Sequence, residues 1–226
     1  IETITVKTAS VTSGLKLTAV DTVIAEGKTL NVDLSDFAGT KFTFTGNAAE
    51  TDGFLNITGS QVTDALIGGA STDTITGGKG ADSITGGKGA DKLTGGAGAD
   101  LFTYEAVVDS TTTGFDTVTD YTSGTDSFGF TIDQSTSISD LTISAKVLTA
   151  AAGTTAVQAN LSAKVGEYIY DTTNSKLYVN VNSDNLLTTQ DYAVSVNAGT
   201  TAANTIAAGD LDFTIKSGAG DDTIVA

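Results

Sequence analysis

The sequence GGASTDTIT GGKGADSIT GGKGADKLT GGAGADLFT occupies residues 68–103 and decides the fold of this chain. It consists of four consecutive nonapeptides in one register, so the period of the repeat is nine. The first six residues of each unit must turn the chain tightly, and glycine reaches the positive-φ conformations that such a turn requires. The last three residues form a short strand whose middle side chain points inward. These middle residues are Ile75, Ile84, Leu93 and Phe102.

An aspartate stands at the sixth position of every unit, and these residues are the first metal-ligand candidates: Asp73, Asp82, Asp91 and Asp100. If two units make one coil, loops eighteen residues apart stack on the same side of the molecule. A cation between two stacked loops is then neutralised by two aspartates. The pattern predicts three ion sites, in which loops 59–64, 68–73 and 77–82 stack on loops 77–82, 86–91 and 95–100, respectively. Carboxylate and carbonyl oxygens suit hard cations such as Ca²⁺ or Mg²⁺.

Two further aspartates extend this pattern beyond the strict repeat. The degenerate unit GSQVTDALI at residues 59–67 keeps Asp64 in phase and is interpreted as the first coil. Asp109 lies nine residues after Asp100 and predicts a fourth site if it pairs with the loop that ends at Asp91. Residues 104–108 contain no glycine, which weakens this fourth site.

The rest of the chain also indicates β-structure, because apolar residues alternate with polar ones in short runs that end in Gly, Asn, Asp or Ser. Over residues 1–58 this spacing fits either the rungs of a β-solenoid or the strands of a sandwich, and we favour rungs because a regular solenoid follows directly. Strand patterns continue after residue 103, and an Ala-rich stretch at 145–165 is a candidate helix. We therefore divide the chain into an N-terminal strand segment (1–58), a nonapeptide roll (59–103) and a C-terminal capping segment (104–226).

The composition restricts both chemistry and partners. The chain has no Cys or His, so it offers no thiolate nucleophile, no triad base and no imidazole ligand for zinc. Its net charge of -16 disfavours nucleic acid and anionic lipid, and no run approaches the roughly 18 apolar residues that span a bilayer. No carboxylate pair is marked as that of a glycosidase. We expect a chain that is not an enzyme, does not bind nucleic acid and does not insert into a membrane.

The GGxGxD units resemble the RTX, or hemolysin-type, calcium-binding repeats. The resemblance implies an all-β, right-handed parallel β-roll with Ca²⁺ between stacked loops, flanked by further strands. It also implies six oxygen ligands per ion: carbonyls of positions one and three with the aspartate of one loop, and carbonyls of positions two and four with the aspartate of its partner. Besides the six aspartates above, the ligands so implied are Gly68, Ala70, Gly77, Gly78, Lys79, Gly80, Gly86, Gly87, Lys88, Gly89, Gly96 and Gly98.

A second resemblance lies downstream, where FDTVTDYTSGTDSF at residues 115–128 is similar to the segment that follows the repeats in serralysin-type secreted proteins. Residues 168–184 and 206–213 resemble later pieces of the same module. In that family the region caps the roll and precedes an uncleaved signal for type I secretion, which residues 221–226 resemble. The resemblance implies a further ion at Asp116 and Asp120, although a solvated strand edge is the favoured explanation of this pair.

Two functions remain open from the sequence. The first is an extracellular structural protein, similar to calcium-dependent bacterial surface-layer or matrix proteins, that is exported by type I secretion and folds on Ca²⁺ outside the cell. Its expected partners are further copies of itself in a lattice or filament, the type I secretion machinery and a cell-surface polysaccharide. The alternative is the C-terminal folding and secretion module of a larger RTX enzyme or adhesin.

Overall fold

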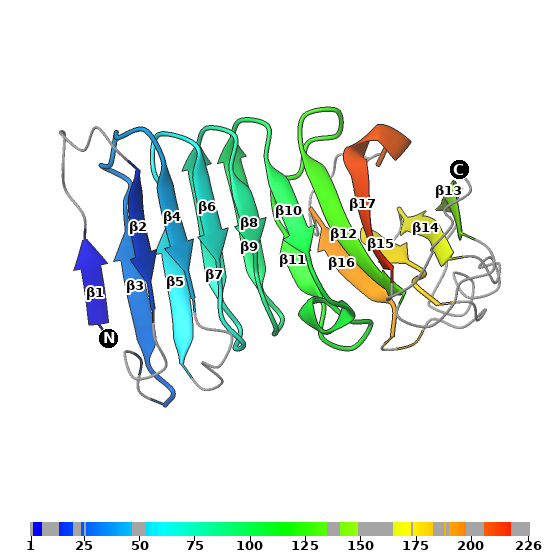
Figure 1. Ribbon diagram of the computed structural model, residues 1–226, viewed down its shortest axis with the longest axis horizontal. Coiled ribbons are helices and arrows are strands. Elements are labelled where there is room, and N and C mark those ends of the chain that lie inside the picture. Colours follow the sequence, from blue (N-terminus) through cyan, green and yellow to red (C-terminus); the bar gives the residue numbers. More distant parts are fainter. Residues whose placement is uncertain are drawn as a thin grey trace.

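The computed structural model describes residues 2–5, 14–19, 24, 26–46, 53–134, 141–148, 165–172, 174–182, 188, 190–197 and 206–217. These residues form two sheets that face each other, and the stacked strands run from β1 at one end to the C-terminal strands at the other (Figure 1). The described part of the chain contains strands and two short 3₁₀ helices, η1 (Val107–Asp109) and η2 (Ala208–Asp210). None of its helices could span a membrane. The expected all-β fold with parallel sheets is confirmed.

Successive strands of the chain belong to the two sheets almost in alternation. The ten-stranded sheet contains, in spatial order, β1 (Glu2–Thr5), β3 (Thr29–Asp33), β5 (Phe54–Thr58), β7 (Thr74–Lys79), β9 (Lys92–Ala97), β11 (Asp116–Val118), β16 (Tyr192–Val196), β15 (Lys176–Val179), β14 (Val165–Asp171) and β13 (Leu141–Leu148). The seven-stranded sheet contains β17 (Leu211–Ser217), β12 (Ser127–Gln134), β10 (Leu101–Tyr104), β8 (Ser83–Thr85), β6 (Asp64–Ile67), β4 (Phe42–Thr45) and β2 (Leu15–Thr18). From β1 to β12 the chain therefore winds as a parallel roll.

The nonapeptide repeat produces a coil of eighteen residues. Strand β7 pairs with β9 so that Ile75 lies beside Leu93, and β8 pairs with β10 so that Ile84 lies beside Phe102. All four side chains are fully buried between the sheets, because the middle residue of each triplet points inward. The expected coil length and the four predicted core residues are confirmed.

The N-terminal strands are rungs of the same roll. Strand β3 pairs in parallel with both β1 and β5, and β4 pairs in parallel with both β2 and β6. A sandwich would join its strands in antiparallel pairs, whereas all of these pairs are parallel. The preference for rungs over a sandwich is thus confirmed, and the sheets pass residue 58 without a break.

The C-terminal strands close the far end of the roll. Strand β16 pairs in parallel with β11 and continues the first sheet into the antiparallel strands β15 and β14, while β17 pairs in parallel with β12. Aromatic rings fill the space between the sheets here, since Tyr104 and Tyr192 both contact Phe130 at centroid distances of 5.2 and 5.0 Å. Apolar burial of this kind stabilises the last coil, whose strands β11 and β12 are covered by β16 and β17.

The helix expected at 145–165 is corrected in part. Residues 141–148 form β13, which pairs in parallel with β14, so the chain is a strand where the helix should begin. Pairing with β14 satisfies the backbone of this strand and outweighs the weak helix propensity of its alanine and lysine. Residues 149–164 lie outside the described residues, as does the repeat-like unit at 217–225 beyond Ser217.

One carboxylate joins the C-terminal strand to the last turn of the roll. Oδ2 of Asp210 accepts hydrogen bonds from the hydroxyls of Tyr121 (2.6 Å) and Ser123 (2.7 Å), and Oδ1 accepts one from the Gly124 amide (3.1 Å). Burial acts to raise the pKa of Asp210, but the bonds from Ser123 and Tyr121 outweigh it and lower the pKa. The carboxylate is therefore held in its charged form at the start of β17.

Replacing this carboxylate should loosen the C-terminal cap. We expect Asp210→Asn to lower the free energy of unfolding by about 1–3 kcal/mol, because an amide nitrogen would face hydrogen-bond donors. The matched control is Asp212→Asn, two residues away on the exposed side of β17, which should change stability by less than about 0.5 kcal/mol. Urea unfolding at saturating Ca²⁺ measures both variants, and equal losses would contradict the role of Asp210.

Candidate metal centre

Two columns of aspartates run along the edges of the roll. The first edge consists of loops that lead from the ten-stranded to the seven-stranded sheet, and the second edge of loops that lead back. In each column, Oδ1 of one aspartate accepts the backbone N–H of the aspartate one coil below, at 2.7–3.0 Å. The first column is Asp64, Asp82, Asp100 and Asp126, and the second is Asp73, Asp91 and Asp116. We call these seven residues the aspartate ladder.

The ladder explains why the sixth position of each unit must carry a short acceptor. The lowest members bond in the same way to ordinary strand residues, since the Leu55 amide donates to Oδ1 of Asp73 at 2.8 Å and the Phe42 amide donates to Asp64. Each carboxylate thus satisfies a peptide N–H at the point where a strand of the coil below begins. This first oxygen has a structural role that needs no metal.

The second carboxylate oxygen divides the ladder into two groups. In Asp64, Asp73 and Asp126, Oδ2 accepts the N–H of the second residue of its own loop at 2.6–2.7 Å. In the other four, Oδ2 is buried and has no hydrogen-bond partner; these are Asp82, Asp91, Asp100 and Asp116. A buried carboxylate oxygen without a partner is costly, so this second group requires a cation or a proton.

Backbone conformation at the second loop position separates the strict loops from the loops of the first group. The three strict loops carry glycines with positive φ at their second and fourth positions, for example Gly87 at 95° and Gly89 at 131°. At the second position the loops of the first group hold Ser60, Gly69 or Thr122, and none of these three residues has positive φ. The second amide of a strict loop therefore does not reach its own aspartate, which leaves Oδ2 free.

Burial and mutual repulsion keep these free carboxylates from ionising in the absence of metal. Burial, together with the charges of Asp64 and Asp100, raises the pKa of Asp82 to about 7. Burial, with the charges of Asp73 and Asp109, raises the pKa of Asp91 to about 8. Burial, with the charge of Asp91, raises the pKa of Asp116 to about 9. A divalent cation reverses this effect, because its charge favours the ionised form.

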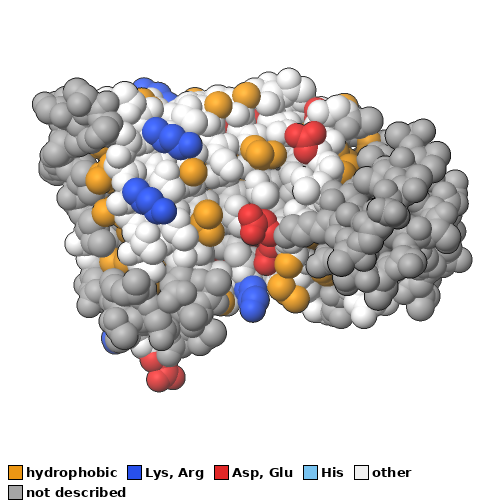
Figure 2. All heavy atoms as spheres, in the orientation of Figure 1, with side chains coloured by type: hydrophobic (Ala, Val, Ile, Leu, Met, Phe, Trp, Pro, Cys, Tyr) orange, Lys and Arg blue, Asp and Glu red, His pale blue; other side chains and the backbone are white. Residues whose placement is uncertain are grey.

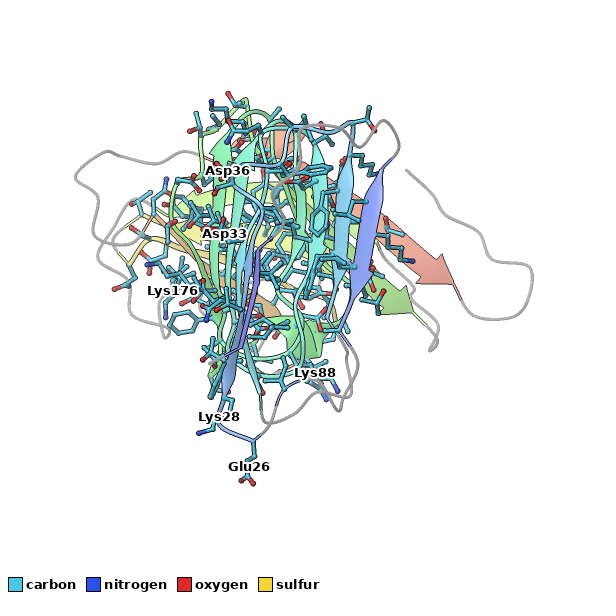
Figure 3. All side chains as sticks on the ribbon, turned by 90° about the vertical axis from the view of Figure 1, so that its left-hand side faces the viewer. Glu26, Lys28, Asp33, Asp36, Lys88 and Lys176 are labelled. Atoms are coloured by element: carbon cyan, nitrogen blue, oxygen red, sulfur yellow. The ribbon has the colours of Figure 1, made fainter. Side chains whose placement is uncertain are left out.

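The predicted carbonyl ligands lie between the stacked loops. The carbonyl oxygens of Gly78 and Gly80 face the α-carbons of Gly96 and Gly98 so closely that a β-carbon there would overlap them. The Lys79 amide donates to the Ser60 carbonyl at 2.9 Å, and the Lys88 amide to the Gly69 carbonyl at 3.1 Å. The lysine side chains are exposed, and Lys88 points away from the roll (Figure 3). Only the backbone of these lysines therefore lies at the loop interface.

The loop after β10 changes the expected fourth site. Asp116, and not Asp109, takes the ladder position above Asp91, because this loop is seven residues longer than a repeat loop. Asp109 lies within the loop, where its Oδ2 accepts the amides of Glu105 (3.0 Å) and Ala106 (2.8 Å). The nine-residue phase from Asp100 is thus broken at this point by the insertion.

Two more downstream aspartates complete the first edge. Asp120 accepts the amides of Gly95 and Gly96, both at 2.8 Å, so it caps a repeat loop rather than continuing the ladder. Asp126 supplies the last ladder position, since it accepts the Asp100 amide at 3.0 Å. Sequence reasoning missed Asp126; the signal available was a glycine two residues before it, as in GGxGxD.

The residues present fit a calcium ion. No three acidic, histidine or cysteine side chains converge as a metal cage among the described residues. The sites are instead built from pairs of stacked aspartates with the peptide oxygens of glycine loops, and the orphaned Oδ2 atoms supply the charge. All donors are oxygens, which is the ligand set that Ca²⁺ prefers.

These features define the class of molecule: a calcium-binding parallel β-roll. The family model of the RTX calcium-binding nonapeptide repeat matches residues 67–102, in four copies. This segment is therefore a set of RTX repeats, it binds Ca²⁺, and such repeats are typical of secreted proteins. A comparison of the chain with curated proteins gives no match.

Proposed function

We propose that this protein is an extracellular structural protein that assembles into a surface layer or matrix. In this proposal it has no catalytic activity, leaves the cell unfolded through type I secretion and folds where Ca²⁺ is millimolar. The observation that carries the proposal is the outer face of the ten-stranded sheet, where threonines of successive coils lie in register.

Each threonine of this row follows a buried core residue on its strand, so its side chain points to the outer face of the sheet. Thr58, Thr76 and Thr94 are cross-strand neighbours, and Oγ1 of Thr94 lies 2.7 Å from Oγ1 of Thr119. Neighbouring strands are about 4.8 Å apart, so the row presents β-branched hydroxyl side chains at a constant spacing. Figure 2 shows one face of the molecule, on which lysine, acidic and hydrophobic side chains are scattered over otherwise uncharged surface. A regular row of uncharged hydroxyl side chains suits contact with an identical row or with a polysaccharide.

Assembly is tested by adding Ca²⁺ to the purified chain. At about 10 mM Ca²⁺, which saturates sites of millimolar affinity, we expect sheets or filaments in electron micrographs and a rise in light scattering. Thr76→Lys should reduce assembly at least about tenfold while leaving the circular dichroism spectrum unchanged. Thr85→Lys, on the outer face of the other sheet, is the matched control. A chain that stays monomeric at this Ca²⁺ concentration would contradict the proposal.

The second candidate is the C-terminal module of a larger RTX enzyme or adhesin. The pairing of β16 and β17 with the last coil favours it, because these strands cap the roll on its C-terminal side. The full reading frame distinguishes the two candidates. An upstream protease or lipase domain would support the module, and further threonine-rich strands would support the structural protein.

A further inference from the structure

The two groups of ladder aspartates indicate which loop pairs hold an ion. We propose that the roll has two complete calcium stations, one on each edge, and that the neighbouring loops are metal-free caps. The first-edge station is Asp82 with Asp100, and the second-edge station is Asp91 with Asp116. The capping aspartates are Asp64, Asp73 and Asp126. This inference rests on calcium binding by the repeats and not on assembly, so the two proposals fail independently.

The stations are the adjacent ladder positions at which both carboxylates have a free oxygen. Asp82 and Asp100 are 2% and 1% exposed, and Asp91 and Asp116 are 2% and 0% exposed. Each has an Oδ2 atom without a partner, and that atom is buried. In Asp82, Asp91 and Asp100 this oxygen lies close to the first glycine of its own loop, as Oδ2 of the capping residues Asp64 and Asp73 also does. Two such oxygens can neutralise one divalent ion, which removes the cost of burying them.

In the caps each carboxylate oxygen already accepts a hydrogen bond. Asp64 accepts the Ser60 amide at 2.6 Å and the Ser60 hydroxyl at 2.8 Å, and Asp126 accepts the Thr122 amide at 2.7 Å. Bonds from N–H to a carboxylate are charge-assisted and strong, so these loops are ordered without an ion. Of the three loop pairs predicted from the sequence, only 77–82 with 95–100 has a free oxygen on both sides.

The Asp120 carboxylate keeps the first station free of competing donors. The amides of Gly95 and Gly96 donate to Asp120, which lies in the next coil. Neither amide is therefore available to Oδ2 of Asp100. This assigns Asp120 a positioning role. Its carboxylate satisfies the loop backbone while that of Asp100 remains directed to the ion.

The inserted loop divides the work between two aspartates at the second station in the same way: one accepts the loop amides, and the other keeps an oxygen for the ion. In a capping loop one aspartate accepts both the amide of the coil below and the amide of its own loop. Here Asp109 accepts the loop amides and Asp116 accepts the Asp91 amide, so Oδ2 of Asp116 stays free. The insertion therefore converts what would be a capping loop into half of an ion site. It places this station partly beyond residue 102, where the repeat match ends.

The ion count of the wild-type chain is the first test. Equilibrium dialysis with ⁴⁵Ca²⁺, or isothermal titration calorimetry, should give two tightly bound ions per chain. Three or more ions of equal affinity would overturn the proposal. This measurement needs no variant, so a failure of a variant to fold does not affect it.

Asparagine substitutions then separate stations from caps. Asp100→Asn and Asp116→Asn should each lower the count from two to one, because the amide retains the Oδ1 acceptor and loses the charge at Oδ2. Asp64→Asn and Asp126→Asn are the matched controls, since they should keep both ions with affinities within about threefold of wild type. These two variants should instead unfold at a lower urea concentration than wild type at saturating Ca²⁺. The reason is that the asparagine NH₂ group would face a backbone N–H, and two donors cannot form a hydrogen bond. Loss of an ion from either cap variant, with its folded spectrum intact, would overturn the assignment.

Discussion

Chelation of Ca²⁺ with excess EDTA at pH 8.5 is expected to unfold the roll. The four free carboxylates are buried, and in the ionised form they would repel one another across the stacked loops. A site with a dissociation constant of roughly 10⁻⁴ M contributes about 1.4 kcal/mol at millimolar Ca²⁺, and coupled sites contribute more. Far-ultraviolet circular dichroism during a Ca²⁺ titration should show a cooperative gain of strand signal. Equal strand signal with and without EDTA would contradict a fold that depends on the metal.

The pH dependence of the chelated protein follows from the same carboxylates. The pKa values of Asp82, Asp91 and Asp116 in the folded chain are about 7, 8 and 9, against 3.8 for an unperturbed aspartate. A raised folded-state pKa means that the ion-free roll is most stable below pH 3.8 and loses stability as the pH rises through 7 to 9. In EDTA the chain should therefore hold more strand signal at pH 5 than at pH 8.5. With saturating Ca²⁺ this order should disappear, because the ion stabilises the charged carboxylates.

Adding a single methyl group to a strict loop, by Gly89→Ala, is expected to have the second largest effect on calcium-dependent folding. Gly89 has a φ of 131°, and a β-carbon there would lie 2.7 Å from the Ser71 carbonyl oxygen of the coil below. Positive φ alone costs an alanine about 1–2 kcal/mol, and the overlap with a backbone atom adds to that cost. Gly89→Ala should thus raise the Ca²⁺ concentration needed for folding by at least about tenfold. The measurement is the midpoint of the dichroism titration.

The control for this substitution lies in the same loop. Ala90 is exposed, and Ala90→Ser adds one polar atom without a change in backbone conformation. Its titration midpoint should stay within about twofold of wild type. If Gly89→Ala also stays within that range, the positive-φ glycines do not hold the loops in their ion-binding shape.

Much of the roll could be predicted because its repeat is strict. Ile75, Ile84, Leu93 and Phe102 recur every nine residues, and a period of nine with alternating sides allows only a coil of eighteen. The N-terminal rungs were harder to predict, since short alternating strands fit a sandwich equally well. The parallel pairs among strands β1 to β6 show that these strands are rungs of the solenoid.

The site was predictable only as far as the repeat extends. Asp109 was in phase by residue count, yet Asp116 continues the ladder, because loop length and not sequence spacing sets the register of the next coil. The contacts of Asp120 were equally out of reach, because it accepts two glycine amides from the loop of the coil below. Hydrogen bonds between residues about 25 apart cannot be read from a local pattern.

Sequence alone therefore establishes the all-β fold, the coil length, the inward-facing core and the ladder aspartates up to Asp100, since each depends on a local period and on residue chemistry. Tertiary structure decides which carboxylate oxygens remain free and where the ladder continues beyond residue 103. The reason is physical: an oxygen is free or filled according to where the neighbouring coil directs its N–H groups, and that depends on the backbone conformation of both coils together.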